Sequence, residues 1–83
     1  MTYADDLLAT CPVEKGLYSL NREYYTKAYY IAFANWGFSA SPVWTCSATD
    51  RFSALSEFGR YVREEVKRDR DWPPPWLRLY RKG

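Results

Sequence analysis

Aromatic side chains are the feature that most constrains this sequence. Sixteen of its 83 residues are aromatic, comprising four Trp, eight Tyr and four Phe. A domain of this size buries only about 60–65% of the surface that its unfolded chain exposes, and one aromatic side chain can bury about 150–250 Å². Rings therefore supply most of the core, but they are too many for the core alone. Some must lie on the surface, where Tyr and Trp are typical of binding sites.

A chain of this length corresponds to one domain. We expect residues 1–83 to form it, with a Trp- and Pro-rich extended tail over residues 71–83. Three consecutive prolines at 73–75 predict a polyproline II segment within that tail.

The sequence predicts a cytoplasmic protein. No apolar run reaches the roughly 18–20 residues that a membrane-spanning helix needs, and the acidic start of the chain does not resemble a secretory signal. The two cysteines, Cys11 and Cys46, are too few for a disulfide framework and are expected to stay reduced.

The N-terminal segment predicts a short helix. Thr2 can cap it, and Asp5 and Asp6 would lie in its first turn, where acidic side chains are favourable. Cys11 precedes Pro12, and the residue before a proline is disfavoured in helical conformation. We therefore expect the helix to end there.

Residues 21–36 fit either a helix or a strand, and hydrophobic periodicity alone does not decide between them. The next segment, 43–48, alternates as a strand does, and a strand needs a partner for its backbone groups. Residues 28–35 are the nearest candidate. We favour a hairpin of about 28–35 and 43–48 in a small antiparallel sheet, which makes the fold class α+β, with an all-α fold as the alternative.

The clearest predicted element is a long C-terminal helix over about residues 50–69, capped by Asp50 or Thr49. Apolar residues recur in it at spacings of three and four, which predicts one apolar stripe. The stripe comprises Phe52, Leu55, Phe58 or Gly59, Val62 and Val66.

Catalytic and metal-binding patterns are missing from the sequence. It contains no histidine, the commonest general base and metal ligand. Two isolated cysteines do not make an ordinary zinc site, and the four glycines are too scattered for a phosphate-binding loop. We therefore predict a protein that is not an enzyme and that carries no cofactor or metal.

Positive charge is concentrated in the C-terminal part. Residues 1–50 carry three basic and five acidic side chains, whereas residues 51–83 carry nine basic and five acidic ones. This asymmetry predicts a partner with an acidic surface. The candidate contact residues are basic side chains of the helix and tail together with exposed aromatic side chains: Tyr25, Tyr29, Tyr30, Arg60, Arg63, Lys67, Trp72, Trp76, Arg78, Tyr80, Arg81 and Lys82.

These features together predict a protein-binding module. A very short, aromatic-rich chain without catalytic residues has the profile of a small phage or mobile-element inhibitor that occludes a surface of a host protein complex. One alternative is a nucleic-acid-binding accessory protein that uses the basic C-terminal helix and tail, although the interleaved acidic residues would repel phosphates. Another is a small structural subunit of a larger assembly. No membrane partner is expected.

Overall fold

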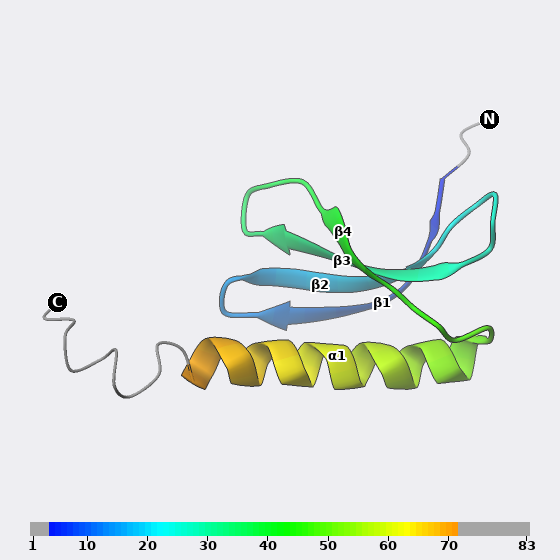
Figure 1. The fold of residues 1–83 in the computed structure, drawn as a ribbon. Helices are drawn as coiled ribbons and strands as arrows, with labels where there is room; N and C mark the ends of the chain where they lie inside the picture. The colour runs from blue at the N-terminus through cyan, green and yellow to red at the C-terminus, as the bar shows by residue number, and fades with distance from the viewer. Residues whose placement is uncertain (1–3, 72–83) are drawn as a thin grey trace, which may run out of the picture.

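The computed structural model describes residues 4–71, with side chains as far as Asp69. Four strands precede one helix: β1 (Asp6–Val13), β2 (Gly16–Arg22), β3 (Tyr29–Asn35), β4 (Ser41–Thr45) and α1 (Arg51–Asp71) (Figure 1). The sheet forms one layer and the helix forms the other. The fold is therefore α+β, and the all-α alternative is wrong.

The sheet is antiparallel with the strand order β1-β2-β3-β4, so each strand pairs with its neighbour in the sequence. The register places Tyr18 opposite Phe33 and Leu20 opposite Ile31, all on the face towards α1. The predicted hairpin is confirmed by the pairing of β3 with β4, in which Ile31 lies opposite Trp44. The second strand of that hairpin runs from Ser41 to Thr45, a few residues earlier than expected.

The predicted N-terminal helix is wrong, because these residues form β1. The strand pairs with β2 from Asp6 to Val13, with an irregularity between Leu7 and Ala9. Leu8 is an extra residue at this point, without a partner in the register. It interrupts the alternation of apolar and polar side chains that would have indicated a strand. Pro12 does not end the element, since an edge strand tolerates a proline.

Two glycines are required where the strands turn. A Cβ atom on Gly16 would overlap the carbonyl oxygen of Ala34 on the neighbouring strand, so this position has no room for a side chain. Gly37 has a φ of +88°, in a turn that the Phe38 N–H closes by donating to the Asn35 carbonyl at 2.9 Å. L-residues with side chains rarely adopt that φ.

Helix α1 begins after Asp50, which is the cap. The backbone N–H of Ser53 donates to a carboxylate oxygen of Asp50 at 3.0 Å, and the N–H of Ala54 donates to its carbonyl at 2.9 Å. A capping carboxylate at this position satisfies helix donors that have no partner within the helix. The Ser53 hydrogen bond, first among several causes, lowers the pKa of Asp50.

The apolar stripe of α1 differs from the predicted one. Ala54, Phe58 and Val62, four residues apart, are buried against the sheet, whereas Phe52 is 80% exposed. Leu55 and Val66 are also exposed, on the same flank of the helix as Phe52. The small side chain of Ala54 hides the buried row in the sequence, because large apolar residues dominate a periodicity search.

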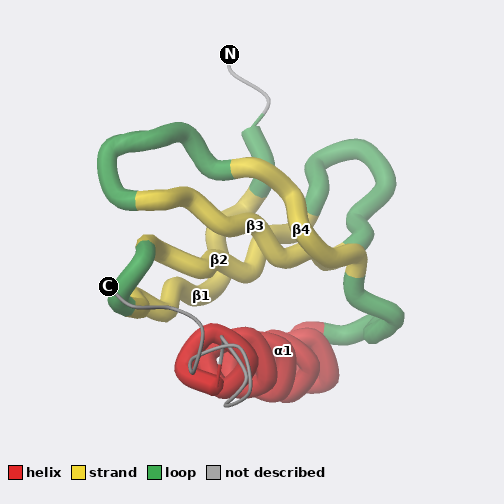
Figure 2. Tube along the Cα trace, turned by 60° about the vertical axis from the view of Figure 1, so that its left-hand side comes forward, coloured by secondary structure: helices red, strands yellow, loops and turns green. Residues whose placement is uncertain are grey.

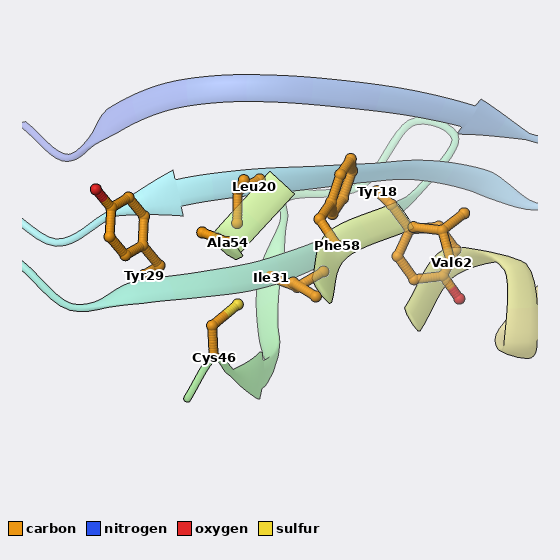
Figure 3. Close-up of a cluster of buried hydrophobic side chains, with 8 residues drawn as sticks. All are labelled: Tyr18, Leu20, Tyr29, Ile31, Cys46, Ala54, Phe58 and Val62. Carbon is orange, nitrogen blue, oxygen red and sulfur yellow. The ribbon is translucent and has the colours of Figure 1, made fainter. Parts of the chain in front are cut away.

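The core lies between α1 and the inner face of the sheet (Figures 2 and 3). Its side chains come mostly from the two central strands and from the helix, and no polar side chain is buried among the described residues. The helix packs mainly against β1 and β2. The buried cluster comprises Tyr18, Leu20, Tyr29, Ile31, Cys46, Ala54, Phe58 and Val62.

The two edges of the sheet, β1 and β4, each contain a proline, Pro12 and Pro42. Proline has no backbone N–H, so each edge has one donor fewer to offer to an added strand. Between residues 4 and 71, no helix is both long enough and apolar enough to cross a membrane.

Candidate functional site

The connection between β3 and β4, together with the first residues of β4, exposes three large apolar side chains. Trp36, Phe38 and Val43 are 56%, 75% and 43% exposed, and the sequence from residue 28 to residue 49 contains no charged side chain. We call residues 36–43 the aromatic arm. Scattered exposed apolar residues are normal on a protein surface, but a concentration of them in an uncharged segment is typical of a contact surface.

The base of the aromatic arm is fixed to the turn between β1 and β2. The Trp36 indole N–H donates to the Glu14 carbonyl at 3.0 Å, and its backbone N–H donates to the Lys15 carbonyl at 3.4 Å. The Lys15 ammonium in turn lies 3.7 Å from an Asp69 carboxylate oxygen on α1. The arm, this turn and the C-terminal part of α1 therefore lie at one end of the molecule (Figure 1).

A groove of about 550 Å³ runs between β4 and α1. The rings of Trp44 and Tyr61 form its floor, with centroids 5.5 Å apart and planes tilted by 34°. Arg60, Glu64 and Arg68 lie along its rim on the helix. We call this feature the β4–α1 groove. Its aromatic floor and charged rim are typical of a binding groove.

Glu57 joins the segment after β4 to the helix. Its carboxylate accepts a hydrogen bond from the Trp44 indole N–H at 2.7 Å and from the Ser47 backbone N–H and hydroxyl at 3.2 Å each. The Ala48 N–H adds a fourth hydrogen bond at 3.3 Å. One side chain on α1 thus satisfies several hydrogen-bond donors of the segment that leads from β4 into the helix.

Partial burial raises the pKa of Glu57, but the hydrogen bonds from Trp44, Ser47 and Ala48 together outweigh it, so the pKa lies below its ordinary value of 4.5. The neighbouring Cys46 thiol shows the opposite situation. Burial, and secondarily the negative charge of Glu57, raise its pKa to about 11. Cys46 is therefore a protonated core residue near neutral pH, and not a reactive nucleophile.

The structure places the predicted basic residues of α1 together. Arg60, Arg63 and Lys67 are exposed and, at spacings of three and four, form one stripe on the outer side of the helix. Arg68, by contrast, has an ion pair with Glu65 at 3.3 Å.

The predicted tyrosines are in three different environments. Tyr29 is buried in the core, with the Arg22 guanidinium 5.5 Å from its ring centroid, so it supports the fold and does not form a contact surface. The Tyr30 hydroxyl donates to the Asp5 carboxylate. Tyr25 is exposed in the turn between β2 and β3, at the opposite end of the sheet from the aromatic arm.

The remaining predicted residues (Trp72, Trp76, Arg78, Tyr80, Arg81 and Lys82) lie outside the described part of the chain. Among the described residues, no group of three or more Cys, Asp and Glu side chains is arranged to hold a metal ion. The residues that sequence reasoning missed are those of the aromatic arm. The available signal was the 22-residue stretch without a charge, residues 28–49.

No protein-family model, curated protein or solved structure matches this chain.

Proposed function

We propose that this chain is a non-enzymatic protein-binding module whose aromatic arm inserts into an apolar pocket on a partner protein. In this proposal it acts as a small phage or mobile-element inhibitor and occludes a surface of a host protein complex. The observation that carries the proposal is the exposure of Trp36, Phe38 and Val43 in one uncharged segment that runs from the end of β3 into β4.

The composition of the arm supports this function. Trp36 is of a residue type that contributes much of the free energy of protein association, and Phe38 is of a type enriched in protein interfaces. Large rigid rings give much contact area at a small cost in side-chain entropy. The hydrogen bonds from Trp36 to the turn between β1 and β2 hold the base of the arm. A preorganised arm loses less conformational entropy when it binds.

The charges near the arm indicate the kind of partner. Lys15 lies beside the base of the arm, and Lys67 and Arg68 lie on the part of α1 that the same turn contacts. Asp69 and Glu65 balance part of this positive charge through their ion pairs with Lys15 and Arg68. A pocket with an acidic rim would complement the remaining charge and would speed association.

Phe38→Ser tests the proposal, with Phe52→Ser as the matched control. Both side chains are among the most exposed of the apolar ones, but Phe52 lies at the start of α1, away from the arm. The tagged full-length chain is used to capture proteins from lysate after nuclease treatment, and bound proteins are identified by mass spectrometry.

We expect Phe38→Ser to weaken capture of the principal partner about 30-fold, as for a binding hot spot, and Phe52→Ser to leave it unchanged. Circular dichroism of both variants checks that the fold is retained. If no protein is captured, or if the two variants behave alike, the arm is not the binding site.

The basic stripe of α1 favours one second candidate function, nucleic-acid binding. Arg60, Arg63 and Lys67 are exposed on one side of the helix and could neutralise phosphates. Affinity for a duplex would then fall steeply as salt concentration rises, and Arg63→Ser would reduce both the affinity and the slope. A response that is flat in salt would remove this candidate.

A further inference from the structure

The β4–α1 groove has an aromatic floor that the described part of the chain leaves open. Trp44 remains 48% exposed even though its indole N–H is bonded to Glu57 and its ring lies against Tyr61. The groove volume of about 550 Å³ is within the range of sites that hold a ligand or a peptide side chain.

The width of the sheet explains why the groove is open. A helix is about 10 Å across, and neighbouring strands lie about 4.8 Å apart, so one helix covers roughly two strands. Helix α1 packs mainly against β1 and β2. The inner face of β3 is still buried in the core at Tyr29 and Ile31, whereas all five residues of β4 are exposed. The edge of the inner face therefore leaves room for a further segment over Trp44 and Tyr61.

The chain has a segment of suitable length at a suitable place. Helix α1 ends at Asp71, three residues beyond Arg68, which lines one end of the groove. From Arg68 back to Ser53, which lines the other end, the helix extends about 22 Å at 1.5 Å per residue. The twelve residues from 72 to 83 span about 37 Å when extended as polyproline II, so they can follow the whole groove.

The chemistry of residues 72–83 also fits the groove. The side chains of Trp72, Trp76 and the prolines at 73–75 all contain rings. Proline-rich segments of this kind bind in grooves lined by aromatic side chains. The segment contains three basic and no acidic side chains. The groove is lined by three glutamates against two arginines, and one of them, Glu64, is exposed on the rim. The charges are therefore complementary.

We propose that residues 72–83 dock in the β4–α1 groove of the same chain. The prolines and their flanking tryptophans cover Trp44 and Tyr61, and the basic end of the segment reaches the part of the groove lined by Glu57 and Ser53. This proposal does not depend on the partner-binding function, because the aromatic arm and the groove expose different side chains.

Paramagnetic broadening in the full-length chain tests the docking. A nitroxide is attached to Lys82→Cys in a Cys11→Ser background, and Cys46 stays unlabelled because it is buried with a raised pKa. We expect the amide signals of Ser47, Tyr61 and Glu64 to lose intensity, and that of Tyr25, at the far end of the sheet, to keep it.

Two controls make the outcome decisive. Replacing both tryptophans, Trp72→Ser and Trp76→Ser, should restore the groove signals, whereas Arg63→Ser on the outer side of α1 should not. Mixing spin-labelled chains with separate isotope-labelled chains should give no broadening. Groove signals that stay sharp in the labelled chain would overturn the proposal, as would broadening between separate chains, which would make a second copy the occupant.

Discussion

At the scale of single residues, the carboxylate of Glu57 accepts more hydrogen bonds than any other side chain between residues 4 and 69. Its carboxylate holds Trp44, Ser47 and Ala48, and thus fixes the end of β4 and the approach to α1. Hydrogen bonds to a charged acceptor are stronger than neutral ones. Stability should therefore depend on the ionisation of this side chain.

Glu57→Gln should lower the free energy of unfolding at pH 7 by about 1–2 kcal/mol, because the amide keeps the shape but loses the charge. The pKa of Glu57 in the folded protein lies below 4.5, its ordinary value, so the wild-type advantage is present above pH 4.5 and is lost as the pH falls through the folded pKa. Urea unfolding of both proteins from pH 7 to pH 3 measures it. A constant difference over that range would show that the carboxylate charge is not the cause.

Gly16 and Gly59 should respond in opposite directions to alanine. A Cβ on Gly16 would meet the Ala34 carbonyl oxygen, whereas one on Gly59, in the middle of α1, would have no neighbour within 4 Å. We expect Gly16→Ala to cost about 1–3 kcal/mol, as overpacking does, and Gly59→Ala to add about 0.5–1 kcal/mol through helix propensity. Thermal unfolding of the two variants measures the change in stability. A change in the same direction for both variants would contradict the close approach at Gly16.

At the scale of elements, sequence reasoning succeeds where one signal dominates. Helix α1 is predictable because its apolar periodicity is long and Asp50 caps it, and the pairing of β3 with β4 is predictable because residues 43–48 alternate and need a partner. Strand β1 is not predictable, because the irregularity at Leu7 and Ala9 breaks its alternation and Pro12 imitates the end of a helix. Pairing with β2 overrides those local preferences.

The candidate site is less predictable than the fold. Arg60, Arg63 and Lys67 are found from charge alone, since a charged helix face is seldom buried. Tyr29 and Tyr30 cannot be separated from sequence, because neighbouring residues on a strand point to opposite faces and only the position of α1 shows which face is covered. The aromatic arm is recognised only with the structure, which shows that its large side chains are exposed.

The cap of α1 gives a prediction at this scale. Asp50→Ala should lower the melting temperature, because the Ser53 N–H loses its acceptor, whereas Asp50→Asn keeps an acceptor oxygen and should lower it less at pH 7. The pKa of Asp50 is lowered below 3.8, mainly by the Ser53 hydrogen bond, so its charge contributes above pH 3.8 and is lost below it. Circular dichroism at 222 nm follows the helix; two variants that melt together at pH 7 would argue against capping by Asp50.

At the scale of the whole molecule, stability should be graded across the sheet. Strands β2 and β3 have a partner on each side, whereas β1 and β4 have one, and β4 has only five residues, all exposed. Local opening costs least where contacts are few.

Amide hydrogen exchange should therefore be slowest at Leu20 and Ile31 and fastest, among the strands, in β4. Native-state exchange measured by NMR gives the opening free energy residue by residue. Equal protection of β3 and β4 would show that the sheet opens as one unit.

The central position of β3 has a consequence for the state of the protein at high concentration. Its sequence, from Tyr29 to Asn35, is uncharged, free of proline and rich in aromatic side chains, which is the signature of a fibril-forming segment. Within the sheet it is enclosed by β2 and β4, and the strands at the two edges contain Pro12 and Pro42. Detachment of β4 would expose the edge of β3 to pairing with other chains. The carboxylate of Glu57 holds the end of β4 through Trp44, so it also lowers the tendency of the protein to aggregate.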